Sequence, residues 1–316
     1  MRESNVRRAG LFFIALVVAA SFVTRLLGVQ PANRADLPVA GGVIKVTFLD
    51  GPWQLSRRDL ESWIETSGKA VATYYKRFPM PVVILNIHGT DGRHIGDGLT
   101  NVNQDGLPQI DISVGRWATT EDLKRDWMLT HEFVHVAFPS QNRRHHWLEE
   151  GLATYVEPWA RVRLGTLTAE SVWRDVARDM PQGEPEAGDQ GLDRTPTWGR
   201  TYWGGAIFCL LADVEIREKT NNKVGLDDAL IGILSAGGNI TQDWTIERTL
   251  ETGDKAVGVS VMTELYRKMA NEPSPVNLND LWKKLGVRYK DGECSLDDHA
   301  PLAAIRRGIE KGTSAS

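Results

Sequence analysis

The sequence predicts an α+β fold, in which a mixed sheet and a metal-binding helix precede a mainly helical part. Three observations support this prediction. All but one of the strand-like segments lie before residue 115. Two histidines spaced four residues apart, His131 and His135, lie in an apolar stretch that follows these segments. From Gly204 onward the hydrophobic pattern is almost entirely helical.

Composition indicates a folded protein without a nucleic-acid partner. The chain has 316 residues, of which 41% are hydrophobic, enough to bury the core of one large domain or of two tightly joined ones. The formal net charge is −4, and there is no long run of like charge and no basic stripe. We therefore expect no binding to nucleic acid.

The amino terminus has the pattern of an export signal. Residues 1–10 carry three arginines, and residues 11–23 are apolar apart from one serine. This apolar stretch is short for a membrane span unless it continues to Val29. We expect residues 1–28 to be a signal peptide or an N-terminal membrane anchor, with any membrane association through residues 11–29. The rest of the chain would then be exported, either held at the membrane or released as a periplasmic or extracellular protein.

The segments that follow predict a helix and a sheet. Residues 29–40 read as a Pro/Ala linker. Residues 42–49 alternate as a strand should, and residues 55–78 repeat apolar side chains at helical spacing until two prolines end the pattern. Residues 81–88 read as a buried strand.

A polar segment then separates this strand from the next one. Residues 89–106 are rich in Gly, Asp and Asn, which predicts a loop or hairpin. Residues 109–114 alternate again as a strand. Together these segments predict an N-terminal α+β subdomain over residues 41–140, which ends in the metal-binding helix.

The metal-binding helix has recognisable ends. Thr119 or Thr120 is a suitable N-cap with acidic residues in the first turn, so we expect one helix from there to Phe138. In a helix, His131 and His135 lie on one face. Two imidazoles so placed can bind one Zn²⁺ ion, and Glu132 between them is placed to act as a general base.

A catalytic zinc site needs a third protein ligand and an open position. Glu149 and Glu150 open a second apolar helix after a polar turn, and both are candidates because they differ by only about 100° around a helix. His145 and His146 lie in the linker before this helix, and we expect neither to be a ligand.

Residues 131–135 (HEFVH) and 147–155 (WLEEGLATY) together resemble the gluzincin metallopeptidases, whose second helix reads W-L-x-E-G-x-A-x-Y. The short separation of the two motifs most resembles the peptidase MA-like group. The resemblance implies a zincin-like catalytic domain with zinc as its cofactor and with Glu150 as the third ligand. It also implies that the strand nearest the cleft pairs with an extended peptide, and we expect residues 109–114 to be that strand.

A third motif resembles the M1 and M61 gluzincins. Residues 201–208 (TYWGGAIF) match their Y-x-x-G-A element, in which the tyrosine hydroxyl donates a hydrogen bond to the oxyanion. By this resemblance that role falls on Tyr202. A phenol suits the role because it is neutral at pH 7 and can donate where negative charge develops. The alternative is that Tyr202 only packs at a helix interface.

The remaining chain predicts a helical subdomain over residues 141–310, followed by a tail at residues 311–316. Residues 181–199 are rich in Gly, Pro and acids, so we expect a mobile loop that can gate the cleft. The expected helices span residues 204–220, 227–235, 243–251, 260–269, 278–285 and 301–309, with a final strand at 287–290. Cys209 and Cys294 are compatible with one disulfide, although the apolar surroundings of Cys209 favour a buried thiol.

Taken together, the motifs predict a zinc-dependent metallopeptidase with a peptide or protein substrate. Zinc would be held by His131, His135 and Glu150. Glu132 would accept the proton of the attacking water, and Tyr202 would bind the oxyanion. The alternative is a non-catalytic, metal-stabilised, exported binding or scaffold protein. Such a protein has no use for Glu132 or Tyr202, and the presence of both residues favours the enzyme.

The direction of cleavage is open. M1 enzymes bind a free amino terminus with a G-x-M-E-N element, and residues 98–101 (GLTN) have at most a distant similarity to it. Both an aminopeptidase and an endopeptidase are therefore compatible with the sequence.

Overall fold

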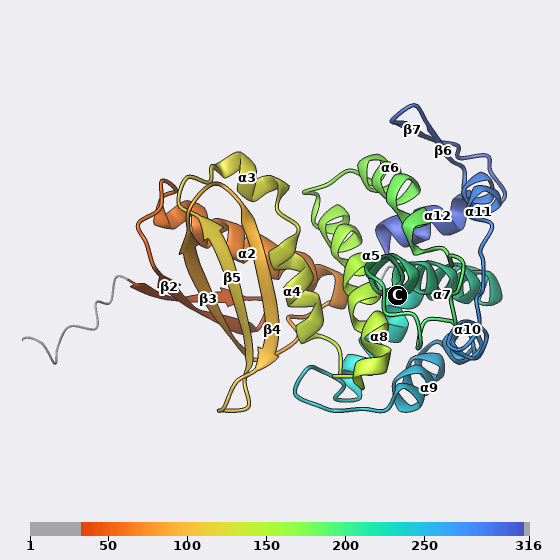
Figure 1. The fold of residues 1–316 in the computed structure, drawn as a ribbon, viewed down its shortest axis with the longest axis horizontal. Coiled ribbons are helices and arrows are strands. Elements are labelled where there is room, and N and C mark those ends of the chain that lie inside the picture. The colour runs from red at the N-terminus through yellow and green to blue at the C-terminus, as the bar shows by residue number, and fades with distance from the viewer. Residues whose placement is uncertain (1–32, 313–316) are drawn as a thin grey trace, which may run out of the picture. The chain divides into compact units, whose positions relative to one another are not determined.

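The structure is a computed structural model, and it describes residues 33–312 (Figure 1). The predicted signal peptide or anchor, residues 1–28, lies outside the described residues. None of the helices within residues 33–312 is long and apolar enough to cross a membrane. From Ala35 onward the chain forms one compact unit.

The first part of this unit contains a five-stranded mixed sheet, as predicted. The strands lie in the order β1-β2-β3-β5-β4. Strands β2, β3 and β5 are parallel to one another, and β4 is antiparallel to β5. The strands are β1 (Arg34–Val39), β2 (Gly42–Leu49), β3 (Val82–Thr90), β4 (Ile95–Val102) and β5 (Pro108–Gly115).

Strand β1 shows that the prediction of a linker over residues 29–40 was wrong for its second half. Leu37 and Val39 alternate with exposed neighbours and are buried, as in a strand that covers a core on one face. Ala40 and Gly41 both have positive φ and form a tight turn into β2. Proline and alanine suggested a linker, but strand pairing and burial determine the structure here.

The position of the edge strand also corrects a prediction. We expected residues 109–114 to lie nearest the cleft, but β5 is an inner strand and β4 is the edge. All of β4 falls in the segment predicted to be a loop or hairpin, and its antiparallel pairing with β5 confirms the hairpin. Gly96 and Gly98 lower its intrinsic strand propensity, and pairing with β5 together with packing against the histidine helix overrides that preference.

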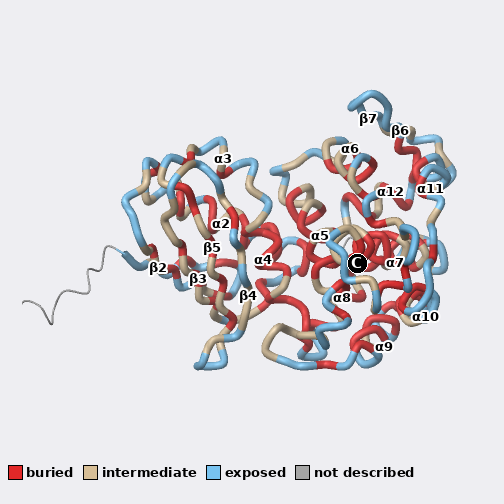
Figure 2. Tube along the Cα trace, viewed as in Figure 1, coloured by how far each residue is buried: buried red, intermediate tan, exposed pale blue. Residues whose placement is uncertain are grey.

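Helix α2 (Arg57–Tyr75) confirms the amphipathic helix predicted at residues 55–78. Ser56 and Asp59 form a capping box that fixes its first turn. Gly68 faces Val39 and Ile44, so the helix packs on the sheet at β1 and β2. Figure 2 shows buried segments running through the sheet strands and through the helices next to them.

The single helix predicted from Thr119 or Thr120 to Phe138 is two helices, α3 (Thr120–Arg125) and α4 (Met128–Val136). The break lies at Asp126. Its carboxylate accepts hydrogen bonds from the backbone N–H groups of Met128 and Leu129 at 3.0 and 3.2 Å, and from the indole of Trp63 at 3.0 Å. Asp126 therefore ends one helix and caps the next, which carries both histidines.

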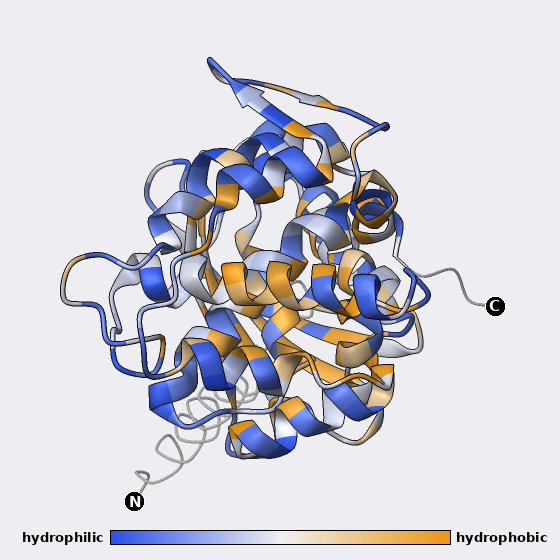
Figure 3. Cartoon of the chain, turned by 90° about the vertical axis from the view of Figure 1, so that its right-hand side faces the viewer, coloured by the Kyte–Doolittle hydropathy of each residue, from blue (hydrophilic) through white to orange (hydrophobic). Residues whose placement is uncertain are grey.

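The second part of the unit is helical, as predicted, and is built around α5 (His146–Leu164). Helix α5 packs against α2, α4 and α7, and Figure 3 shows apolar residues gathered on central helices with polar residues outside them. The other helices are α6 (Ala169–Asp179), α7 (Gly205–Lys219), α8 (Leu226–Ser235), α9 (Ile246–Val257), α10 (Met262–Met269), α11 (Leu278–Leu285) and α12 (Ala303–Lys311). Short 3₁₀ segments η2 (Arg143–His145) and η3 (Met180–Gly183) and a π-helical turn η4 (Arg200–Gly204) connect them.

The strand predicted at residues 287–290 is present, but it is the first arm of a hairpin. It consists of β6 (Val287–Lys290) and β7 (Glu293–Leu296). Cys209 and Cys294 are both buried free thiols, so they do not form the disulfide that their number allowed.

Candidate metal site

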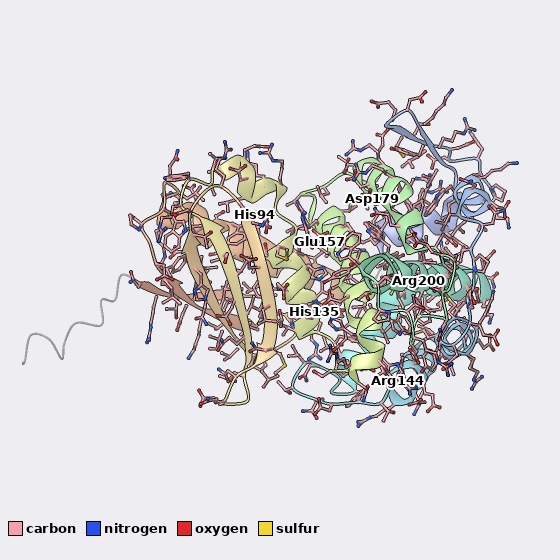
Figure 4. The ribbon with its side chains drawn as sticks, in the orientation of Figure 1. His94, His135, Arg144, Glu157, Asp179 and Arg200 are labelled. Carbon is pink, nitrogen blue, oxygen red and sulfur yellow. The ribbon has the colours of Figure 1, made fainter. Side chains whose placement is uncertain are left out.

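Helices α4 and α5 bring His131, His135 and Glu150 together. The Nε2 atom of His131 lies 3.1 Å from Oε2 of Glu150, and Nε2 of His135 lies 3.6 Å from the same oxygen. One ligand atom from each residue lies within 4.8 Å of the others. Figure 4 labels His135 on α4, the helix between the sheet and the helical part.

The donor set fits a zinc ion. Two imidazole nitrogens and one carboxylate oxygen are typical ligands of catalytic zinc, and two donors about 2.0–2.1 Å from a tetrahedral ion lie about 3.3 Å apart. The separations of 3.1 and 3.6 Å from the Glu150 oxygen to the two rings lie on either side of that value. His131 and Glu150 are 3% and 9% exposed, so bulk water does not solvate them well.

The charges suit metal binding as well. Burial alone would raise the pKa of Glu150, but hydrogen bonds and charge interactions with His131 and His135 outweigh it and hold the pKa well below its usual range. Burial lowers the pKa of His131. Burial also acts to lower the pKa of His135, but interactions with Glu150 raise it overall. Glu150 is thus ionised, and His131 favours its neutral form, as metal ligands must.

Glu132 lies in the same cavity and is held by the edge strand. The hydroxyl of Thr100 on β4 donates a hydrogen bond to Oε2 of Glu132 at 2.5 Å. Gly98, two residues earlier, leaves room for this carboxylate, because a Cβ atom at that position would lie 2.5 Å from Oε1 of Glu132. The sequence analysis compared residues 98–101 with the G-x-M-E-N element but gave neither residue a role beside Glu132, since neither belongs to a local motif with it.

Tyr202 lies beside the cluster. Its ring stacks on that of His131 with a centroid separation of 6.4 Å. Burial, followed by the negative charges of Glu150 and Glu132, raises the pKa of Tyr202 to about 12. The phenol therefore keeps its proton at neutral pH and can donate a hydrogen bond.

A close approach of two helices places Tyr202. A Cβ atom on Gly151 of α5 would lie 2.2 Å from the Cα atom of Gly205, and one on Gly205 would lie 2.1 Å from the carbonyl oxygen of Trp147. Only glycine at these two positions allows α5 and the start of α7 to pack this closely. Gly151, which ends the sequence WLEEG, and Gly205, which ends the sequence YWGG, thus lie against each other.

The neighbouring polar residues have other partners. Glu149 accepts a hydrogen bond from the backbone of Gln141 at 3.1 Å and lies 3.3 Å from Nδ1 of His146. His145 lies 2.9 Å from Asp193, away from the cluster. Neither Glu149 nor His145 thus belongs to the cluster, as expected.

His146 has a closer relation to the site than we expected. Its Nε2 atom lies 3.3 Å from Oε1 of Glu150, the oxygen that does not face His131. The i, i+4 spacing of His146 and Glu150 on one helix could have predicted this contact.

One cavity of about 730 Å³ is lined by the three residues of the cluster and by Glu132 and Tyr202. Its walls come from β4, α4, the first turns of α5, Tyr202 and the segment around Ile240. Strand β4, rather than β5, borders the cavity. His88 on β3 lies outside this cavity and contacts Asp111 on the neighbouring strand β5 at 3.1 Å.

Comparison with solved structures identifies the fold. One similar structure is an aminopeptidase N family protein from Idiomarina loihiensis, with 13% identity and a TM-score of 0.62, covering 80% of this chain and 49% of that one. Another is a variant of a two-domain M1 zinc metallopeptidase bound to L-arginine, with 12% identity and a TM-score of 0.50, covering 77% of this chain and 53% of that one. The mixed sheet and helices therefore have the fold of M1 peptidase domains, and the chain spans about half the length of these proteins. No family model matches the sequence, and no curated protein is similar to it.

Proposed function

We propose that this protein is a zinc-dependent metallopeptidase of the gluzincin type that hydrolyses peptide bonds. The observation that carries the proposal is the convergence of His131, His135 and Glu150 within 4.8 Å of one another, in a cavity that also holds Glu132 and Tyr202. The fold shared with M1 peptidase domains supports it. We further propose that the protein acts outside the cytoplasm, because its amino terminus reads as an export signal or anchor.

His131, His135 and Glu150 would hold the zinc ion, which when bound activates water and polarises the scissile carbonyl. All three residues line the cavity, where a substrate would approach. The low pKa of Glu150 keeps one negative charge among the ligands.

Glu132 would act as the general base and then as the general acid. Its carboxylate would accept a proton from the attacking water and deliver it to the departing amine. Tyr202 would donate its hydroxyl proton in a hydrogen bond to the oxygen that becomes negatively charged. The free edge of β4 would hold the extended peptide backbone through main-chain hydrogen bonds.

The test compares zinc content and peptide hydrolysis in the full chain and in Glu132→Gln. We expect stoichiometric zinc in both proteins and a loss of kcat of about a hundredfold or more in the variant. Glu150→Gln should lose zinc, while the matched variant Glu149→Gln should keep it.

Two outcomes would contradict the proposal. Stoichiometric zinc without hydrolysis of casein or of any aminoacyl amide would favour a non-catalytic binding protein of the same fold. Equal rates of hydrolysis for the wild type and Glu132→Gln would show that Glu132 is not the general base.

A further inference from the structure

Large apolar side chains that face water gather around the candidate site. Among residues 33–312, six large hydrophobic side chains are exposed, namely Leu99, Val102, Trp117, Trp127, Trp198 and Tyr289. Leu99, Val102 and Trp127 line the cavity of the candidate site, and Trp198 stacks on Tyr202. Exposed apolar groups that cluster in this way mark binding surfaces, whereas single ones need no explanation.

Two of these side chains end a row of aromatic rings that runs through the site. Trp198 stacks on Tyr202 with centroids 5.6 Å apart, and Tyr202 stacks on His131 at 6.4 Å. Trp127 meets the other end of the row, edge to face with His131 at 5.4 Å. Trp127 and Trp198 are 47% and 61% exposed, so both keep ring surface free to pack on a bound molecule.

The edge strand offers apolar contacts on both of its faces. Thr100 pairs with the buried Ile110 and points to the helix side of the sheet, while Leu99 pairs with Asp111 and points to the opposite side. Val102, two residues after Thr100, shares its face. An extended segment along β4 presents its side chains alternately to both faces, and it would meet Leu99 on one and Val102 on the other.

The charges in the cavity favour the same class of substrate. Asp97, Glu149 and Asp243 line it in addition to the proposed catalytic residues. These carboxylates repel acidic side chains, and the tryptophans gain little from small polar ones.

We infer that the site selects an extended polypeptide segment with bulky apolar side chains, preferably aromatic, on the two sides of the reacting bond, one packing on Trp127 and the other on Trp198. This inference rests on the proposed peptidase function for the position of the reacting bond. The preference itself is a property of binding and can be measured without turnover.

The test uses the full chain carrying Glu132→Gln and two fluorescent peptides of equal length, one with two central phenylalanines and one with two central serines. We expect the phenylalanine peptide to bind at least about tenfold more tightly. Trp127→Ala and Trp198→Ala, each added to this protein, should reduce that ratio severalfold while leaving the Kd of the serine peptide nearly unchanged.

Trp117→Ala is the matched control, because Trp117 is 58% exposed but, unlike Trp127 and Trp198, neither lines the cavity nor stacks on a ring that does. It should leave the ratio unchanged. Trp198→Phe, which keeps a ring beside Tyr202, should restore most of the preference lost in Trp198→Ala. Equal Kd values for the two peptides, or an equal loss of the ratio in Trp117→Ala, would overturn the inference.

Turnover by the wild-type protein separates this inference from the proposed function. If the phenylalanine peptide binds tightly and through the tryptophans but neither peptide is cleaved, the binding preference is supported and the proposed peptidase function is contradicted. Cleavage of both peptides by the wild type, together with equal Kd values for them, would support the peptidase and contradict the inference.

Discussion

Thr100 is the residue through which the edge strand reaches the proposed general base. Its hydroxyl has one proton and two nearby acceptors, Oε2 of Glu132 at 2.5 Å and the backbone oxygen of Glu132 at 3.1 Å. The carboxylate oxygen lies closer than the backbone oxygen, so the hydroxyl proton points to it. Thr100 therefore fixes the rotamer of the base before substrate binds.

Replacing Thr100 by valine keeps the shape of the side chain and removes this hydrogen bond. We expect kcat to fall about 10- to 100-fold with little change in KM, because a hydrogen bond to a charged group contributes about 1.5–3 kcal/mol. Thr100→Ser should recover most of the rate. Steady-state kinetics on one peptide, together with zinc content, would measure this, and equal rates for the valine and serine variants would show that the hydroxyl has no such role.

At this scale, the sequence allows prediction only where the chemistry is local. His131 and His135 share a face because of helical periodicity alone. Glu149 and Glu150 could not be separated by periodicity, and the structure distinguishes them because Glu149 turns to Gln141 and His146. The role of Thr100 could not be predicted from the sequence, since its contact with Glu132 depends on which strand forms the sheet edge.

Secondary-structure elements show the same division between local and non-local causes. The capping residues of α2, Ser56 and Lys76, directly flank the helix, so its ends depend on local sequence. The position of α2 was therefore predicted to within a few residues. Residues 89–106, which contain β4, were predicted to be a loop or hairpin because they are rich in Gly, Asp and Asn, and β4 forms a hairpin with β5. Gly98 is needed there for the approach of Glu132, which no local pattern reveals.

The contact of α5 with the start of α7 gives a prediction about an element. In Gly151→Ala, the new methyl group would collide with the backbone of Gly205 at 2.2 Å, so the two helices must move apart. We expect a loss of about 1–3 kcal/mol in the free energy of unfolding and a large fall in kcat, because Tyr202 moves with α7.

Gly68→Ala in α2 is the matched control, because its methyl group would meet only side-chain atoms at 3.0 Å or more. The better helix propensity of alanine offsets much of that crowding. Denaturant unfolding and peptide hydrolysis would be measured on both variants. A Gly151→Ala protein as stable and as active as Gly68→Ala would contradict the role assigned to this contact.

In the whole molecule, the site joins two parts of different architecture. Helix α4 packs against β4 and β5, and α5 packs against α7 in the helical part, so the proposed ligands come from both. The order of these parts along the chain follows from hydrophobic periodicity. Strand order and the packing of α4 on α5 cannot be predicted from this periodicity, because they depend on contacts between segments far apart in the sequence.

An ion held between α4 and α5 should stabilise the whole fold. A ligand that binds only the folded state adds about 2.7 kcal/mol to the free energy of unfolding at a hundredfold excess over its Kd. With an unfolding entropy of about 2.1 cal/mol/K per residue, each kcal/mol shifts the Tm of a 316-residue protein by about 1.5 °C. We therefore expect 1,10-phenanthroline to lower the Tm of the full chain by roughly 4 °C, and added zinc to restore it. His135→Ala should unfold at the lower temperature with or without the chelator, since one of the three proposed ligands of the ion is missing. Differential scanning calorimetry measures these values, and an equal drop in wild type and His135→Ala would place the stabilising ion elsewhere in the chain.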